Sequence, residues 1–132
     1  MTYIDTLNYD IYYDIRDMRI AGSLFEVDEC LAEVISILNK KGYHTEYCCS
    51  GHLRKTRYNN LTELHDNLYI TFSDKMRFKT INFPKDFEVE YSDYFDDRII
   101  IRKYYKSEEG FERFKEIYET VEILYKWAIS LL

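Results

Sequence analysis

Residues 43–52 of the sequence, YHTEYCCSGH, hold the side chains best suited to chemistry. Cys49 is the second of two adjacent cysteines, and His52 follows it by three residues. A nucleophilic cysteine must be a thiolate, and a nearby histidine can act as the base that produces one. A Cys49–His52 dyad is therefore one hypothesis, but the spacing identifies no third residue to orient the histidine. We assign no catalytic residue on this basis.

The same segment is suited to holding an anionic ligand. Gly51 has no Cβ, so a ligand can approach the main chain closely, and the backbone N–H groups of such a turn can converge on a phosphate or carboxylate. Arg54 and Arg57 would add charge-assisted hydrogen bonds. The predicted ligand-binding turn comprises Cys49, Ser50, Gly51, His52, Arg54 and Arg57. The alternative is a strand-ending turn with buried thiols and solvated basic residues.

The cysteines and histidines do not have the spacing of a metal site. Cys48 and Cys49 would project to opposite faces of a strand, so they are poorly placed to share an ion. His44, His52 and His65 form no paired knuckle with the cysteines. We therefore predict no metal site.

Part of the chain resembles the wybutosine-synthesis tRNA methyltransferase family. The resemblance is carried by Val27–Asn39, Tyr43, Thr45 and Cys49-Ser50-Gly51. In that family an acidic helix ending near Asn precedes an aromatic–Thr strand and a Ser-Cys-Ser-Gly-Arg turn, whose last residue is His52 here. The resemblance spans residues 27–52, and it implies a shared α+β fold and a turn near the family's cofactor and tRNA site. The cofactor implied is S-adenosylmethionine.

A second candidate surface is the acidic stretch of residues 86–97, DFEVEYSDYFDD. It has six carboxylates and no basic residue, with aromatic residues between them. Strand alternation would place Glu88 and Glu90 on one face, where carboxylates and aromatic rings could imitate a nucleic acid toward a basic protein. The predicted partner-binding surface comprises Asp86, Glu88, Glu90, Tyr91, Asp93, Tyr94, Asp96 and Asp97. The alternative is a solvated strand followed by an acidic loop.

Composition narrows the function classes further. The 132 residues carry a net charge of −6, which disfavours direct nucleic-acid binding because that requires basic surface. Three cysteines, an odd number, indicate reduced thiols and a cytoplasmic protein, and we see no signal peptide or membrane span. The acidity and the 14 tyrosines resemble small phage inhibitors such as anti-CRISPR proteins. A scarcity of Pro, Gly and Ala fits an AT-rich bacterial or phage genome.

The hydrophobic pattern predicts a single α+β domain over residues 1–132, with a mixed or antiparallel sheet of about four to five strands. Residues 27–40 have an apolar stripe of helical spacing, and Gly42 is a suitable C-terminal cap. Strands are expected over residues 43–49, 68–73, 87–91 and 98–104, with another strand or strand edge around Met76 and Phe78. For residues 3–19 we favour a short helix or an extended arm.

The C-terminal residues 108–131 predict a long amphipathic helix that closes the fold. Its predicted core stripe comprises Phe111, Phe114, Ile117, Tyr118, Val121, Leu124, Tyr125 and Ala128. Tyr118 and Tyr125, seven residues apart, could instead form the seam of an oligomer.

The sequence therefore predicts a small cytoplasmic binding protein of phage or mobile-element origin that needs no cofactor. It would inhibit or sequester a nucleic-acid-handling or defence protein through the acidic aromatic surface. The alternative is an RNA-modifying enzyme that binds a nucleotide or S-adenosylmethionine at the CCSGH turn. A third hypothesis is a housekeeping domain whose function is an oligomer contact.

Overall fold

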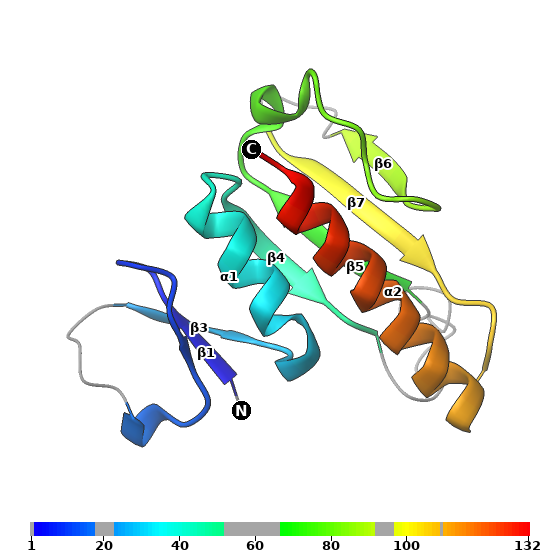
Figure 1. The fold of residues 1–132 in the computed structure, drawn as a ribbon, viewed down its shortest axis with the longest axis horizontal. Coiled ribbons are helices and arrows are strands. Elements are labelled where there is room, and N and C mark those ends of the chain that lie inside the picture. Colours follow the sequence, from blue (N-terminus) through cyan, green and yellow to red (C-terminus); the bar gives the residue numbers. More distant parts are fainter. Residues whose placement is uncertain (1, 18–22, 52–66, 92–96, 109) are drawn as a thin grey trace, which may run out of the picture.

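The computed structural model describes residues 2–17, 23–51, 67–91, 97–108 and 110–132, and it has an α+β fold (Figure 1). This confirms the predicted fold class. The strands are β1 (Thr2–Asp5), β2 (Ile11–Tyr12), β3 (Leu24–Val27), β4 (Thr45–Cys49), β5 (Asn67–Phe72), β6 (Glu88–Tyr91) and β7 (Ile99–Tyr104). The α-helices are α1 (Ala32–Lys40) and α2 (Gly110–Ser130), and the 3₁₀ helices are η1 (Ile15–Asp17), η2 (Glu29–Leu31) and η4 (Lys75–Phe78).

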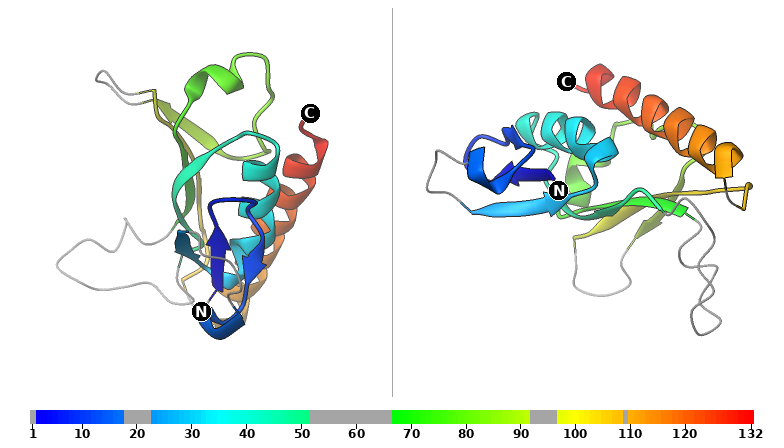
Figure 2. Two further views of the ribbon diagram at one scale, coloured as in Figure 1. Left: turned by 90° about the vertical axis from the view of Figure 1, so that its left-hand side faces the viewer. Right: turned by 90° about the horizontal axis from the view of Figure 1, so that it is seen from below.

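The larger sheet has four antiparallel strands in the order β4-β5-β7-β6. Its central strands, β5 and β7, carry the apolar runs that the sequence indicated. Ile70 lies opposite Ile101, and both are fully buried. Because side chains alternate across a strand, this row marks the inner face of the sheet. Both helices cover that face, and no described helix covers the other (Figure 2).

The long helix α2 confirms the predicted helix, and its predicted stripe is confirmed in part. Leu124 and Ala128 are buried, and Ile117, Val121 and Tyr125 are partly buried against the core. The fully buried or nearly buried side chains of α2 are Arg113, Thr120, Leu124, Trp127 and Ala128. Phe111, Phe114 and Tyr118, which we predicted in the core, are exposed. The side of α2 that faces the sheet carries Thr120 and Leu124. The apolar side chains of Phe111, Phe114 and Tyr118 therefore remain on the outer flank of the helix.

Lys41, just after α1, fixes the C-terminal end of α2. Its Nζ donates hydrogen bonds to the carbonyl oxygens of Ala128, Ile129 and Leu131 at 2.8, 2.7 and 2.6 Å. A cation is favourable at a helix C-terminus, where carbonyl groups lack partners within the helix. The two helices are therefore joined by charge as well as by packing.

The N-terminal residues form a second sheet, of order β2-β1-β3, rather than the helix or arm that we predicted. Ile4 of β1 is fully buried and pairs with Ile11 of β2 and Phe25 of β3. Positive φ at Tyr9 (61°) lets the chain reverse between the first two strands. The apolar residues of this segment have helical spacing by chance, and the segment forms paired strands instead.

The predicted helix over residues 27–40 is shorter in the structure. Val27 ends β3, and Asp28 is extended, with φ −64° and ψ 133°. The 3₁₀ helix η2 then leads into α1, which begins at Ala32. Asp28 stands at the N-cap position of η2, but its side chain makes no capping hydrogen bond, because its carboxylate accepts hydrogen bonds from Ser50.

The strand predicted around Met76 and Phe78 is also wrong, because these residues belong to the 3₁₀ helix η4. Asp74 precedes that helix, and its Oδ1 accepts a hydrogen bond from the Met76 N–H at 2.9 Å. This local cap favours a helical turn over an extended strand. Phe78 is buried against Phe72, with ring centroids 4.6 Å apart.

Candidate functional site

The turn after β4 is bound tightly to the segment that precedes α1. The backbone N–H and the hydroxyl of Ser50 both donate to Oδ2 of Asp28, each at 2.8 Å. Ser50 is 92% buried, its exposed fraction being 8%. The Asp28 carboxylate thus takes the position that an anionic ligand would occupy at the Ser50 N–H group.

Gly51 is packed against the connection that leads from β7 to α2. The Tyr105 hydroxyl donates to the Ser50 carbonyl at 2.6 Å, and the Gly51 N–H donates to the Cys49 Sγ at 3.4 Å. A Cβ at Gly51 would lie 2.6 Å from Cε2 of Tyr105 and 3.1 Å from the Asn67 carbonyl oxygen. The space beside Gly51 is therefore filled by the fold. His52, Arg54 and Arg57, the other predicted members of the ligand-binding turn, lie outside the described residues.

The three cysteines are free thiols whose pKa values all lie above the usual range. Desolvation of the thiol is the main cause at each of them, even at Cys30, whose side chain keeps an exposed part, and the nearby Asp28 carboxylate adds to it. For Cys48 the pKa is raised to about 12, whereas Cys49 also receives a hydrogen bond from Gly51 that partly opposes the effect of burial. At neutral pH these groups are protonated thiols, which are poor nucleophiles. Within the described residues, the surroundings of these thiols favour the protonated form and not a reactive thiolate.

The outer face of the four-stranded sheet carries the acidic residues of β6. Directly paired residues of an antiparallel sheet lie on the same face, so the register fixes its rows. One row runs Cys49–Tyr69–Arg102–Glu88, and the next runs Tyr47–Thr71–Ile100–Glu90. Tyr104, opposite Asn67, extends the same face. We call the side chains of Tyr47, Tyr69, Glu88, Glu90, Ile100, Arg102 and Tyr104 the open face.

Glu88 and Glu90 are both exposed on the open face, and Val89 between them turns toward the core. The aromatic companions of these carboxylates come from other strands. Tyr47 and Tyr104 are exposed, while Tyr69 is half-buried. The sequence reading had looked for the aromatics within residues 86–97 and missed these three.

The other members of the predicted acidic surface do not all share this face. Tyr91 pairs with Ile99, whose side chain is in the core, so it lies on the opposite side of β6. There it lines a hollow with Lys75 and Met76. Asp86 and Asp97 are exposed near the two ends of the β6 segment. Asp93, Tyr94 and Asp96 lie outside the described residues.

Arg102 is a cation in the middle of the open face that the sequence reading did not include. Its Nε donates to Oε2 of Glu90 at 3.0 Å, its Nη1 donates to Oδ1 of Asn67 at 2.9 Å, and its guanidinium lies 5.3 Å from the Tyr69 ring centroid. These contacts fix the position of Glu90 and pair its charge, while Glu88 lies directly opposite Arg102 in the register. Alternation from the buried Ile99 and Ile101 could have placed Arg102 on the outer face, but its position beside Glu90 depends on the pairing of β6 with β7.

No group of three or more His, Cys, Asp and Glu side chains within the described residues is arranged to hold a metal ion. No helix of the described part of the chain has the length and apolar character needed to span a membrane.

The chain was compared with protein-family models, curated proteins and solved structures. None of the three comparisons produced a match.

Proposed function

We propose that this chain is a non-enzymatic binding protein that captures a basic, nucleic-acid-handling protein through the open face. The observation that carries the proposal is the placement of Glu88 and Glu90 on one exposed face of the sheet. The proposal extends to a role as inhibitor or sequestering partner in a phage or mobile element, which the acidic, tyrosine-rich composition supports.

A basic partner is recognised best by carboxylates and aromatic rings that are held in fixed positions. The strand holds the two carboxylates at fixed positions, and complementary charge raises association rates and selects among partners. The exposed ring of Tyr104 can pack against an arginine side chain of the partner, whereas Tyr47 already has the guanidinium of Arg98 at 6.0 Å from its ring centroid. The Arg102–Glu90 pair adds order to this face, so less side-chain entropy is lost on binding.

A simpler role for the same carboxylates must be distinguished. β6 lies at the end of the strand order and is an edge strand. Charged residues on an edge prevent pairing with other chains, and Glu88 and Glu90 could serve that purpose alone. The two roles differ in what charge reversal does. Lysines protect an edge strand as well as glutamates do, so a purely protective role predicts a soluble protein with unchanged interactions. Loss of a binding surface gives a soluble protein without its partner.

Affinity capture from a bacterial lysate separates these possibilities. We expect the wild-type chain to retain one protein in stoichiometric amount, and Glu88→Lys with Glu90→Lys to lose it while remaining monodisperse. Cys49→Ala tests the turn on which the enzyme alternative depends, and it should retain the partner. Capture that survives the charge reversal would contradict the proposal, and survival together with a loss caused by Cys49→Ala would favour the enzyme alternative.

The enzyme alternative has a direct test of its own. S-adenosylmethionine at about a hundredfold excess over its Kd would stabilise the fold by about 2.7 kcal/mol. The proposed binding function expects no shift of the melting temperature with this compound or with nucleotides. A clear shift would favour the RNA-modifying enzyme instead.

A further inference from the structure

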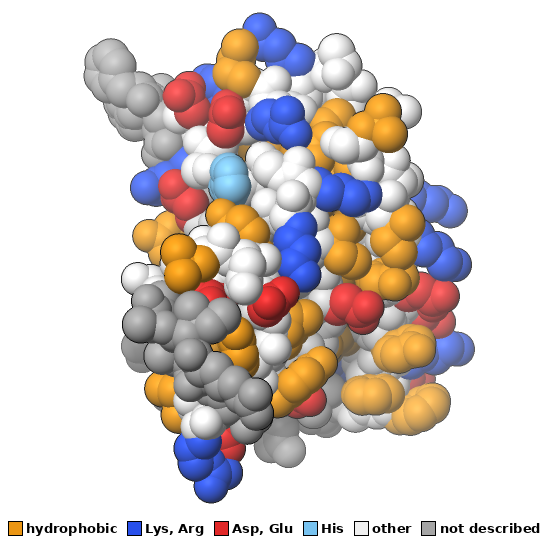
Figure 3. All heavy atoms as spheres, turned by 60° about the vertical axis from the view of Figure 1, so that its left-hand side comes forward, with side chains coloured by type: hydrophobic (Ala, Val, Ile, Leu, Met, Phe, Trp, Pro, Cys, Tyr) orange, Lys and Arg blue, Asp and Glu red, His pale blue; other side chains and the backbone are white. Residues whose placement is uncertain are grey.

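The outer flank of α2 carries an apolar stripe that the fold leaves uncovered. Phe111, Phe114 and Tyr118 have exposed fractions of 79%, 55% and 66%. Their spacing of three and four residues aligns them along one side of the helix. Figure 3 shows hydrophobic side chains gathered toward the lower right of the view, where the N-terminal half of α2 lies, with acidic side chains beside them.

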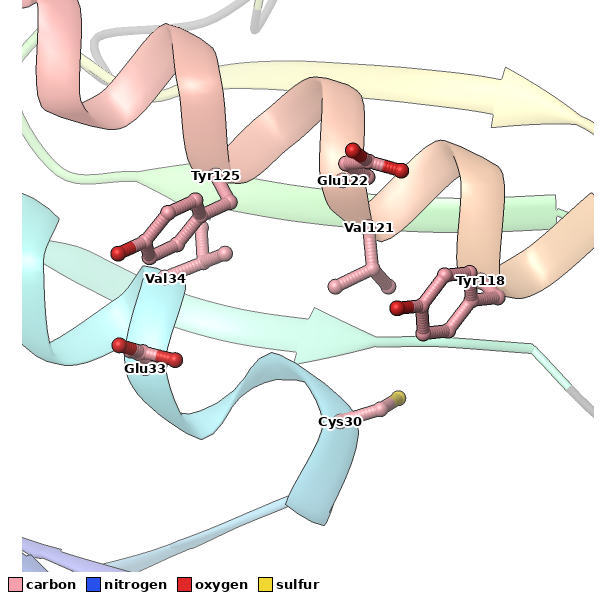
Figure 4. A pocket seen from close by; sticks show the side chains of 7 residues that line it. All are labelled: Cys30, Glu33, Val34, Tyr118, Val121, Glu122 and Tyr125. Carbon is pink, nitrogen blue, oxygen red and sulfur yellow. The ribbon is translucent and has the colours of Figure 1, made fainter.

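The stripe continues into a groove between the two helices. Tyr118, Val121 and Tyr125 of α2 face Cys30 and Val34, which come from η2 and α1 (Figure 4). The groove encloses about 220 Å³. The apolar floor and the two tyrosine rings resemble the surface on which an amphipathic helix lays its apolar face.

The walls of the groove are acidic on both sides. Glu33 stands on the α1 side and Glu122 on the α2 side (Figure 4), and no Lys or Arg lines the described groove. Glu122 is paired with Lys126 at 3.4 Å, but both side chains are largely exposed, and such i,i+4 pairs contribute only about 0.3–0.5 kcal/mol. The groove therefore presents an apolar floor between two carboxylates.

We propose that the groove between α1 and α2 docks an amphipathic helix of a partner protein that carries Lys or Arg beside its apolar stripe. From Phe111 to Tyr125 the stripe spans 14 residue steps, or about 21 Å at 1.5 Å per residue. This length accommodates about four turns of a helix. The basic residues of the docked helix would meet Glu33 and Glu122 as its apolar residues cover Val121. The proposal does not depend on the open face, which lies on the other side of the sheet.

A second copy of this chain fits the groove poorly. Along the exposed edge of α2 the charges run Lys115, Glu119, Glu122, Lys126, which reads the same in both directions. A two-fold antiparallel contact centred on the groove would place Lys115 opposite Lys126 and Glu119 opposite Glu122. It would also bring two acidic grooves together in chains that each carry a net charge of −6. Charge complementarity thus selects a basic partner.

The test uses a fluorescent Leu/Lys peptide of about 18 residues, long enough for the four turns, with leucines at every third and fourth position. A peptide of the same composition in scrambled order is the control. We expect the patterned peptide to bind the wild-type chain, and Glu33→Lys with Glu122→Lys to raise its Kd by roughly tenfold or more. Tyr118→Ala should weaken binding as well, and it changes only an exposed side chain.

Charge reversal on the open face provides the matched control variant. Glu88→Lys with Glu90→Lys changes the net charge by the same amount, and we expect the peptide affinity to stay within about twofold, since long-range charge effects are screened by salt. Equal weakening by both pairs of substitutions, or equal binding of the scrambled peptide, would show attraction by total charge only and overturn the proposal. Absence of peptide binding to the wild-type chain would overturn it too.

Two further measurements locate the bound peptide and identify the occupant. Cys30 is exposed at the groove, so bound peptide should slow its reaction with a maleimide, and an unchanged rate would contradict docking there. Sedimentation should show a monomer at concentrations used for binding. A dimer that Tyr118→Ala dissociates would assign the groove to a second copy and overturn the proposal.

Discussion

At the scale of single residues, the described part of the turn after β4 is engaged by the fold itself. Ser50 and Gly51 are held by Asp28 and Tyr105 through short hydrogen bonds and close packing. Asp28 reaches the turn because the chain is extended at that residue instead of helical. A turn of small residues next to a thiol is also what a ligand cradle requires, so residue types alone could not separate the two roles.

Gly51→Ala provides a test of this structural role. The substitution is expected to destabilise the fold by about 2–4 kcal/mol, because the new Cβ would lie within 2.6 Å of Tyr105 in a backbone with φ of +85°. Gly110→Ala is the matched control, since Gly110 has φ of +73° but no atom within 4 Å of the added Cβ. Urea denaturation should show the larger loss at Gly51. Equal losses would contradict the packing argument.

The buried thiol of Cys48 gives the fold an alkaline limit. Its pKa is raised from 9.0 to about 12 by burial, so the folded chain keeps its proton where the unfolded chain loses it. Stability from this group is complete below pH 9 and is lost as the pH rises toward 12. One such group contributes a slope of at most about 1.4 kcal/mol per pH unit.

We therefore expect Cys48→Ala to show a shallower loss of stability than the wild-type chain across that alkaline range. Denaturant midpoints measured between pH 8 and pH 11 provide the comparison, with the slope as the quantity of interest. Parallel curves for the two proteins would contradict the assignment of this titration to Cys48.

At the scale of elements, α2 is held in place by its contact with Lys41 as well as by its buried stripe. Lys41→Met keeps most of the aliphatic stem but removes three hydrogen bonds to the last carbonyls of the helix. We expect a loss of about 1–3 kcal/mol, because hydrogen bonds from a charged donor are stronger than neutral ones. Thermal or urea unfolding measures it.

Lys40→Met is the control for that substitution. Lys40 pairs with Asp10 at 3.2 Å, and both side chains are about half exposed, so its loss should cost under about 1 kcal/mol. A similar loss at both positions would indicate that Lys41 acts as a surface charge and not as a cap for α2.

The type of an element was predictable where its apolar residues follow a regular pattern. It was less predictable where a side chain caps a local turn, as at η4, or where the paired strand is distant in the sequence. The apolar runs of β5 and β7 and the period of α2 were sufficient to identify those elements. The buried side of α2 was predicted correctly at Leu124 and Ala128 but not in the N-terminal half of the helix, where Arg113 is buried against Tyr105 and Phe111 is exposed. Arginine is rarely fully buried unless it is paired. Arg113 has an exposed fraction of 0%, and its contacts with the Ser107 carbonyl and the Tyr105 ring explain its position.

At the scale of the whole molecule, the fold separates two surfaces of different character. The open face offers carboxylates and tyrosines on one side of the sheet. The helices cover the other side (Figure 2) and form an apolar groove with acidic walls. The sequence predicted the Glu88–Glu90 pair from strand alternation alone. It could not predict Arg102 beside them or the groove, because both depend on which strands and helices become neighbours.

Ionic strength should affect the open-face interaction in a characteristic way. Because the proposed contact is between exposed charges, raising the salt concentration from about 0.05 to 0.5 M should slow association more than it speeds dissociation. Stopped-flow or biosensor kinetics with the captured partner measure both rates. A salt effect confined to dissociation would place the important charges away from this surface.

The most direct measurement is the Kd of the purified partner for three forms of the chain by calorimetry: wild-type, Glu88→Lys with Glu90→Lys, and Glu33→Lys with Glu122→Lys. If the open face is the main binding surface, the first pair of substitutions raises the Kd at least about tenfold, which is about 1.4 kcal/mol, and the chain stays folded. A Kd unchanged by that pair would contradict the proposed function, whatever the groove variant does.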